Sequence, residues 1–213
     1  MAPDVWNAVK AVAITPAYSA EHPLLRVQVE RAGLPWQVLR EHSDLVRVRS
    51  ILLTQALATG AERIVLLDAD TIPADGALEQ LVASDLVTSD QALFGLYPQR
   101  EGHRWQVAVK DPSVAGGAVE AGEPFEVEWG GLGFCVIHRE SLARLSRQLP
   151  TIEGDCVMWQ PWCLPLVRGS VYLAEDRAFC LRLAEAGTRL LCNPKLRAAH
   201  AVTRLIAGLS PRA

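Results

Sequence analysis

Apolar runs and helically spaced apolar positions alternate along the first hundred residues. Residues 64–67 (Ile-Val-Leu-Leu) form an unbroken apolar run, which is typical of a strand covered on both faces. In residues 44–59 the apolar side chains recur near helical spacing, and Gly60 is a favourable stop. The alternation of strands and helices predicts a parallel, Rossmann-like sheet flanked by helices. The predicted strands are residues 9–15, 36–39, 64–67 and 92–96, and the predicted helices are residues 21–32, 44–59 and 75–86.

The second half of the chain has a different pattern. Residues 151–169 contain prolines and two tryptophans but no period, which predicts a long loop, and long loops in compact domains are often functional. A glycine-rich loop is expected at residues 115–122, between two strands. The remaining predicted elements are strands at residues 105–110 and 125–129, an apolar segment at 132–137, helices at 140–147 and 175–187, and a short strand at 189–192 that ends near Pro194.

Length and composition bound the class of protein. A chain of 213 residues is long enough for one α/β domain with a real core, and we expect a single domain over residues 1–213. Hydrophobic residues make up 50% and charged residues 21%, which is an ordinary globular balance. The net charge of −3 argues against a nucleic-acid partner, which would need clustered Lys and Arg. An anionic ligand would need local help from a cation, a helix N-terminus or a few placed arginines.

The sequence also indicates a compartment. Residues 1–10 lack the apolar run of a signal peptide, and no stretch approaches the roughly 20 apolar residues of a membrane span. The cysteines are scattered without a C-x-x-C motif, and Cys135, Cys180 and Cys192 lie in apolar segments typical of buried thiols. Cys156 and Cys163 could pair, but other marks of a secreted disulfide scaffold are missing. We therefore expect a cytoplasmic protein with no membrane span.

Asp68 and Asp70 directly follow the buried strand at residues 64–67. In open α/β sheets ligands bind outside the carboxyl ends of the strands, and alternate residues of an extended segment face the same way. Both carboxylates could therefore face one site, where Mg²⁺ or Mn²⁺ would relieve their repulsion. A structural role is equally open, because an Asp at a strand end often caps a turn or a helix. Asp75 can cap the next helix without help from either residue.

Acidic residues and a histidine late in the chain are further candidates. Glu175 and Asp176 open a predicted helix, where acids stabilise the first turn by helix-dipole and capping interactions. Their functional role would be that of a general base, which inverting glycosyl transfer needs to take a proton from the acceptor hydroxyl. His200 could be a third metal ligand, although a lone histidine is more often structural or exposed.

The aromatic residues of the second half leave several roles open. Trp159 and Trp162 could form an acceptor platform or a lid, since flat aromatic faces stack on sugars. They could equally pack the loop onto the core or onto a second subunit, which leaves a homodimer open. The same choice of roles applies to His103 and Trp105.

Six segments occur in an order and spacing that is informative as a set. They are Ile14-Thr15-Pro16-Ala17-Tyr18 in the first strand and its turn, Arg49 in Val48-Arg49-Ser50-Ile51-Leu52, Asp68-Ala69-Asp70, Trp129-Gly130-Gly131-Leu132-Gly133-Phe134, Glu175-Asp176 and His200. Together they resemble the family-2-like GT-A glycosyltransferases, including compact bacterial and phage-type members. The resemblance extends over roughly residues 10–200, with Asp68-Ala69-Asp70 in the place of the D-x-D motif.

This resemblance implies a hexosyltransferase-type enzyme that moves one sugar from a UDP- or GDP-sugar to an acceptor hydroxyl, with inversion. It implies Asp176, beside Glu175, as the general base, and Mn²⁺ or Mg²⁺ held by Asp68, Asp70 and His200. Residues 1–100 would bind the nucleotide sugar, and residues 101–213, with a small mixed sheet, would face the acceptor. The acceptor stays open between a glycan, a lipid carrier, a protein and a small molecule. The implied donor contacts are Thr15, Pro16, Ala17, Tyr18, Arg49, Asp68, Ala69, Asp70, Trp129, Gly130 and Gly131.

The sequence departs from the family pattern in places. In the family the second strand often ends in an acidic residue that binds the nucleotide base. Here residues 40–44 (Arg-Glu-His-Ser-Asp) do not show which side chain would take this role. The absence of a Q-x-x-R-W signature argues against a processive synthase, and only Glu175-Asp176 indicates inversion. A sugar-phosphate nucleotidyltransferase would need a glycine-rich basic loop after the first strand, and residues 15–21 contain no glycine or lysine. A non-catalytic nucleotide-sugar-binding module and a plain α/β scaffold stay open beside the glycosyltransferase.

Overall fold

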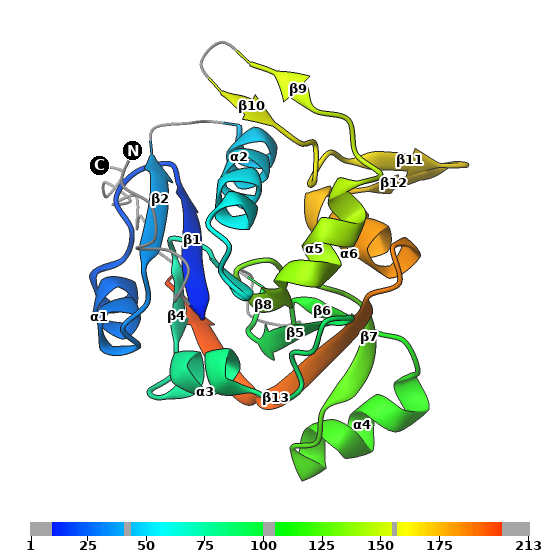
Figure 1. Ribbon diagram of the computed structural model, residues 1–213. Helices are drawn as coiled ribbons and strands as arrows, with labels where there is room; N and C mark the ends of the chain where they lie inside the picture. The colour runs from blue at the N-terminus through cyan, green and yellow to red at the C-terminus, as the bar shows by residue number, and fades with distance from the viewer. Residues whose placement is uncertain (1–9, 41–43, 100–104, 155–156, 202–213) are drawn as a thin grey trace, which may run out of the picture.

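The computed structural model describes residues 10–40, 44–99, 105–154 and 157–201 (Figure 1). Within them nine strands form one sheet, in the order β2-β1-β3-β8-β5-β13-β7-β6, with β4 paired to β13. The strands are β1 (Ala11–Ala17), β2 (Trp36–Arg40), β3 (Arg63–Leu67), β4 (Thr71–Pro73), β5 (Gln91–Leu96), β6 (Val107–Val109), β7 (Phe125–Gly130), β8 (Phe134–His138) and β13 (Arg189–His200). The helices are α1 (Pro23–Arg31), α2 (Leu45–Ala58), α3 (Ala77–Ala83), α4 (Pro112–Ala121), α5 (Arg139–Ser146) and α6 (Glu175–Glu185).

The strands predicted in the first hundred residues all run in one direction. β1 is parallel to β2 and to β3, and β5 runs the same way because β8 lies between β3 and β5 and is antiparallel to both. The insertion of β8 was not predicted, since nothing local in an apolar run such as residues 134–138 tells which strands it will pair with. The antiparallel strands β7 and β6 continue the same sheet beyond β13.

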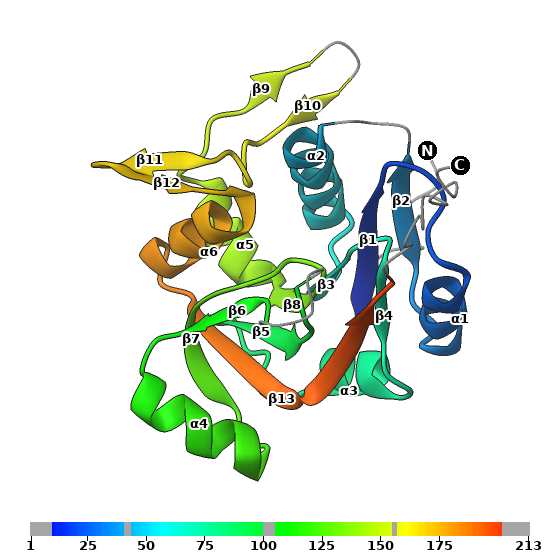
Figure 2. The ribbon, with the colours of Figure 1, turned by 180° about the vertical axis from the view of Figure 1, so that it is seen from behind.

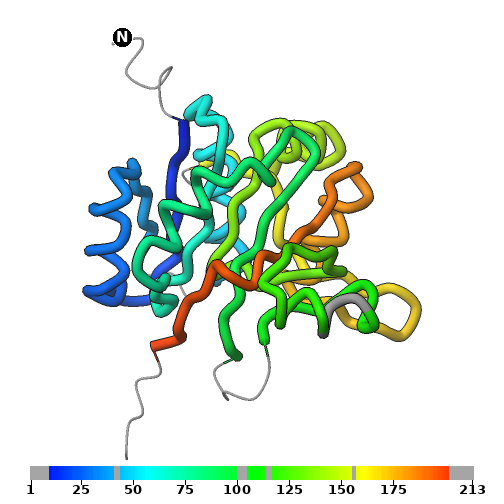
Figure 3. The backbone as a smooth tube through the Cα atoms, turned by 90° about the horizontal axis from the view of Figure 1, so that it is seen from below, coloured from blue at the N-terminus to red at the C-terminus, as the bar shows by residue number. Residues whose placement is uncertain are grey.

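Helices cover both faces of this sheet, as Figure 3 shows from below. Alternate residues of a strand point to opposite faces. Val12 and Ile14 of β1 therefore join a core with residues of α2, α5 and α6, while Ala13 joins a second core with residues of α1 and α3. In β3, Leu66 and Val65 divide between the two cores in the same way. The unbroken apolar run at residues 64–67 is thus explained by burial on both faces.

Two local predictions are wrong. Residues 115–122 are not a loop but most of helix α4, because Asp111 accepts a hydrogen bond from the Ser113 N–H (2.9 Å) as N-cap and Pro112 stands at the first helical position. Asp75 does not cap α3. The N-cap is Gly76 (φ 76°), which makes no side-chain cap bond, while the Asp75 carboxylate accepts from the Gln28 amide at 2.9 Å.

The last strand is much longer than the predicted residues 189–192. β13 continues past Pro194 to His200, with a shift of register between Asn193 and Arg197 in its pairing with β5. Proline lacks the N–H of a regular ladder, and an irregularity of this kind is where a strand tolerates it. The end of β13 then pairs with β4.

The predicted long loop at residues 151–169 contains short strands. β9 (Ile152–Glu153) pairs with β10 (Met158–Trp159), and β11 (Leu166–Arg168) pairs with β12 (Val171–Leu173) just before α6. We call these two pairs the outer hairpins. Figures 1 and 2 show them extending beyond the sheet, and Val167 and Tyr172 are 71% and 63% exposed there.

Trp159 and Trp162 connect the outer hairpins to the core. Trp162 is fully buried, and its indole N–H donates to the Thr54 hydroxyl of α2 at 2.9 Å. Trp159 is 8% exposed. Trp162 therefore packs into the core, and Trp159 is buried as well, which favours packing over an exposed platform for both tryptophans.

No helix in the described part of the chain is both long enough and apolar enough to cross a membrane.

Candidate functional site

Residues 68–71 form a turn at the carboxyl end of β3, which we call the carboxylate turn. The Thr71 N–H donates to the Asp68 carbonyl (3.0 Å), and the Asp68 N–H donates to the Gly133 carbonyl (3.1 Å). The prediction that Asp68 and Asp70 share a face of an extended segment is therefore wrong, since β3 already ends at Leu67. The two carboxylates have different neighbours.

Asp70 lies beside His200. The pairing of β4 with β13 places His200 opposite Thr71, and the Ala201 N–H donates to the Asp70 carbonyl at 2.8 Å. His200 Nε2 is 3.8 Å from Asp70 Oδ1, which is beyond hydrogen-bond range. The His200 side chain is only 9% exposed, so its ring is held in place facing Asp70.

Asp68 is held by Arg49, which projects from α2. Arg49 Nη2 donates to Asp68 Oδ1 at 2.5 Å, and Arg49 Nη1 donates to Glu175 Oε1 at 3.2 Å. Arg49 is 4% exposed. Burial lowers the pKa of the guanidinium, but the charge of Asp68 and its hydrogen bond outweigh burial and the net pKa is raised above the ordinary value. One buried cation thus joins the carboxylate turn to the start of α6.

Asp176 follows Glu175 in the first turn of α6. Its carboxylate accepts a hydrogen bond from the Arg177 N–H at 2.7 Å. Burial raises the pKa of Asp176 above its ordinary value, and the bond from Arg177 opposes this without cancelling it. Because Glu175 is engaged by Arg49, the two acids have distinct surroundings: one is ion-paired and the other is partly desolvated.

The predicted donor contacts in and after β1 differ in exposure. Thr15 is fully buried and its hydroxyl accepts from the Trp36 indole N–H at 2.9 Å, and Pro16 and Ala17 are buried as well. Tyr18 is 77% exposed, and Ala69 accepts a backbone bond from the His22 N–H through its carbonyl (2.8 Å). Their contact with a nucleotide, like that of Arg49, stays a prediction.

The glycines of the segment after Trp129 make room for buried side chains. A methyl group on Gly130 would meet the Phe94 ring, and one on Gly131 would meet the Tyr97 hydroxyl. On Gly133 it would lie 2.8 Å from Asp68 Oδ2, 2.8 Å from the Tyr97 hydroxyl and 2.9 Å from Thr71 Oγ1. This segment therefore packs against the carboxylate turn. Trp129 itself lies under the guanidinium of Arg177, 5.3 Å from its ring centroid.

The end of β2 carries an ion pair that the sequence did not indicate. Arg40 Nη2 donates to Glu21 Oε2 at 2.7 Å, and Arg26 donates to the other oxygen of the same carboxylate. The Glu21 side chain is only 3% exposed. Asp44 caps α2 by accepting from the Arg47 N–H (3.0 Å), whereas residues 41–43 and His103 lie outside the described residues.

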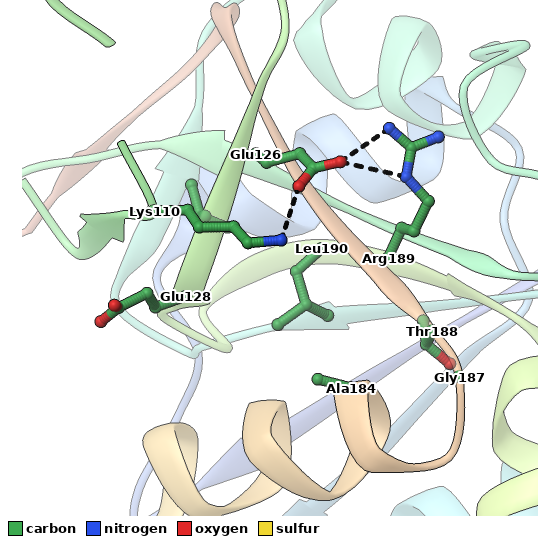
Figure 4. A pocket seen from close by; sticks show the side chains of 9 residues that line it. Lys110, Glu126, Glu128, Ala184, Gly187, Thr188, Arg189 and Leu190 are labelled. Atoms are coloured by element: carbon green, nitrogen blue, oxygen red, sulfur yellow. Dashed lines mark hydrogen bonds and ion pairs between the residues drawn. The ribbon is translucent and has the colours of Figure 1, made fainter. Parts of the chain in front are cut away.

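A groove of about 560 Å³ lies elsewhere, between the end of α6 and strands β7 and β13. Figure 4 shows Glu126 between Lys110 and Arg189, with contacts of 2.9 and 2.8 Å. Because one carboxylate occupies both cations, the groove offers no free positive charge to an anionic ligand. None of the predicted site residues lines it.

The side chains at the carboxylate turn fit a cation whose coordination shell would be completed by a bound ligand. Within residues 10–40, 44–99, 105–154 and 157–201, no group of three or more His, Cys, Asp and Glu side chains is arranged to hold a metal alone. Asp70 and His200 offer one carboxylate and one imidazole, and His200 Nδ1 is buried without a hydrogen bond in the described residues. Mg²⁺ and Mn²⁺ sites of this kind use one or two protein ligands and complete the shell with phosphates and water.

The fold is the GT-A fold, a large mixed sheet with helices on both faces and a carboxylate turn at the end of its third strand. Solved structures that share it include the following two. A197 from STIV has 17% sequence identity and a TM-score of 0.59, and the match covers 91% of this chain and 86% of that one. GalNAc-T7, in a crystal structure with UDP, GalNAc and Mn²⁺, has 16% identity and a TM-score of 0.53, covering 91% of this chain and 44% of that one. No model of a known protein family and no curated protein matches the sequence.

Proposed function

We propose that this protein is a metal-dependent glycosyltransferase that moves one sugar from a nucleotide-diphosphate sugar to an acceptor hydroxyl, with inversion. One observation carries the proposal: Arg49 binds both Asp68 and Glu175, so two acidic motifs far apart in sequence meet at one place. Asp70 and His200 lie at the same turn. Burying an ion pair costs desolvation free energy that the attraction does not always offset, so stability alone explains this cluster less well than a functional site does.

The donor would be bound at the carboxylate turn. We assign Asp70 and His200 as ligands of Mn²⁺ or Mg²⁺, with the Arg49-bound Asp68 beside them. When bound, such a cation supplies Lewis-acid stabilisation of the diphosphate leaving group. The crystal structure of GalNAc-T7 with UDP, GalNAc and Mn²⁺ supports this assignment by analogy of fold. Residues 1–100 would form the donor side of one domain over residues 1–213, and residues 101–213 the acceptor side.

Asp176 would act as the general base. Its carboxylate would accept the proton of the acceptor hydroxyl while that oxygen attacks the anomeric carbon and the bond to the diphosphate breaks. A raised pKa makes a carboxylate a stronger base, and burial raises the pKa of Asp176. Glu175, bound to Arg49, would orient the first turn of α6 so that Asp176 faces the acceptor.

Calorimetric titration with UDP and with GDP tests the proposal, first in Mn²⁺ and then in EDTA. We expect one nucleotide to bind in Mn²⁺ and to lose its binding in EDTA. Asp70→Ala should lower the affinity at least about 100-fold, in line with the loss of a metal ligand, without unfolding the protein. Asp75→Ala is the matched control, because Asp75 is an exposed acid bound to Gln28 and Arg31 on another surface. Binding that ignores EDTA, or an Asp70→Ala protein that binds like the wild type, would contradict the metal assignment.

A further inference from the structure

Tyr97 is a buried polar residue that neither a sequence motif nor the mechanism above uses. It follows β5 directly, is 2% exposed, and its hydroxyl accepts a hydrogen bond from the Gly133 N–H at 2.9 Å. A buried tyrosine hydroxyl usually has a hydrogen-bond partner, because burying a polar group costs free energy unless its hydrogen bonds are made. The residues around Tyr97 show what its hydroxyl and its ring contact.

The hydroxyl end of Tyr97 lies against the carboxylate turn. The position of a methyl group on Gly133 is within 3 Å of three oxygens: the Tyr97 hydroxyl, Asp68 Oδ2 and Thr71 Oγ1. Burial raises the pKa of Tyr97 well above its ordinary value, and the nearby charge of Asp68 adds to this. Arg49 therefore binds Asp68 at Oδ1, while Oδ2 and the Tyr97 hydroxyl both border the small space beside Gly133.

The ring of Tyr97 lies against His200. The two ring centroids are 5.2 Å apart and the planes meet at 86°, an edge-to-face contact. His200 reaches the site at the end of a long strand, and its Nδ1 makes no hydrogen bond in the described part of the chain. In many metal sites that nitrogen is fixed by a hydrogen bond to a neighbouring group. Here the Tyr97 ring is the contact that orients the imidazole toward Asp70.

We propose that Tyr97 is a positioning residue of the cation site, which orients His200 through its ring and holds Gly133, whose carbonyl binds the Asp68 N–H, through its hydroxyl. The inference rests on the proposed function, because it assumes that Asp70 and His200 bind the cation. Gly131 and Gly133 belong to the same device, since a side chain at either position would occupy the space of the Tyr97 hydroxyl. The glycine-rich segment thus serves the donor side of the site as well as any acceptor.

The test compares Tyr97→Phe, which removes only the hydroxyl, with Tyr97→Leu, which also removes the ring. The readout is the apparent dissociation constant of Mn²⁺ in the presence of UDP or GDP, measured from the paramagnetic resonance signal of the free ion against the same nucleotide without protein. We expect Tyr97→Leu to weaken Mn²⁺ binding by about 10- to 100-fold, the usual effect of losing a partner of a metal ligand. Tyr97→Phe keeps the ring, so it should weaken Mn²⁺ binding much less than Tyr97→Leu does. The protein with His200→Ala should bind Mn²⁺ weakly, and adding Tyr97→Leu there should weaken it little further.

A purely structural role would give a different result. Circular dichroism and thermal unfolding are measured on each variant, and Thr54→Val, which removes the hydroxyl that accepts from the Trp162 indole, is the control for destabilisation alone. If Tyr97→Leu and Thr54→Val lower the melting temperature equally and both leave Mn²⁺ affinity within about twofold of wild type, the inference is overturned. If the losses of Mn²⁺ affinity from Tyr97→Leu and His200→Ala simply add in the double variant, Tyr97 does not act through His200 and the proposed ring contact is overturned. A wild-type protein that binds no Mn²⁺, with or without UDP or GDP, would overturn the proposed function and this inference with it.

Discussion

The carboxylate turn and the outer hairpins are held in opposite ways. At the turn, Arg49 binds the Asp68 carboxylate at Oδ1, and the Asp68 N–H donates to the Gly133 carbonyl. In the outer hairpins the cross-strand pair Val167–Tyr172 is largely exposed, whereas Trp159 and the connecting residues 161–163 are buried. The fold therefore keeps its buried charged groups at the carboxylate turn apart from the exposed surface of the outer hairpins, and α6 connects the two regions. Rigid surroundings suit groups whose geometry must be set before a ligand arrives.

Asp176 stands where the two regions meet, and its substitution should have the largest effect. Asp176→Asn should spare nucleotide binding and lower sugar transfer by about 10² to 10⁴-fold, because the amide cannot accept the proton. The measurement is nucleotide release from the sugar nucleotide, with water as acceptor if no other is found. Protonation removes the base, so wild-type activity should fall as the pH drops through a pKa above the ordinary 3.8 of Asp. Asp85→Asn, in an exposed position, is the control, and normal transfer by Asp176→Asn would remove it from the mechanism.

Trp162 tests whether the outer hairpins depend on their buried anchor. Trp162→Ala should lower the free energy of unfolding by about 3 to 5 kcal/mol, since it empties a large site in the core and removes the hydrogen bond from the indole to the Thr54 hydroxyl. Urea denaturation measures this. Trp105→Ala, at a 44% exposed tryptophan, should cost clearly less. Equal losses for the two variants would show that burial does not distinguish them.

Gly133→Ala tests the rigidity of the carboxylate turn. The new methyl group would stand within 3 Å of Asp68 Oδ2, the Tyr97 hydroxyl and Thr71 Oγ1, so we expect a loss of about 1 to 3 kcal/mol in stability. Mn²⁺ binding should weaken as well, because Asp68 must move. Gly117→Ala is the matched control: no atom lies within 4 Å of its added methyl group, and alanine in the helix α4 should be neutral or slightly stabilising. Equal stability of the two variants would contradict the close packing.

The smallest effect is expected at the surface of the outer hairpins. Val167→Ser and Tyr172→Ser should each change the free energy of unfolding by no more than about 0.5 kcal/mol, because both side chains are more than half exposed. Nucleotide binding in Mn²⁺ should be unchanged. A lower rate of transfer with unchanged nucleotide binding would place the acceptor on this surface, whereas a loss of nucleotide binding would break the separation between the two regions.

The sequence predicted this fold best where burial on both faces leaves a periodic mark. β1, β2, β3, β5 and the helices between them lie within a few residues of their predicted positions. The sequence-based prediction failed where strands pair with partners far away in the chain. β8 lies between β3 and β5, and β13 continues past Pro194 because β5 and β4 supply partners for it. Helix α4 was missed because its glycines are typical of a loop, and the helix-start signal of Asp111 and Pro112 was given too little weight.

The candidate site was predicted in part. The acidic motifs and His200 were identified from their order in the chain, and the structure brings Asp70 to His200 and Asp68 to Glu175 through Arg49. Tyr97 was missed, although it directly follows a buried strand just as Asp68 does, and that rule could have found it. Its role depends on the glycines at 131 and 133 and on His200, which only the folded chain brings near.

The strand β13 occupies the interior of the sheet, between β5 and β7, although it is the last strand of the described chain. During synthesis, the apolar edges of β5 and β7 must wait for residues 189–200 to leave the ribosome, and pairings of such long sequence separation form slowly. His200 is the final residue of that strand. A growing copy therefore gains the histidine beside Asp70 in the same event that completes its sheet.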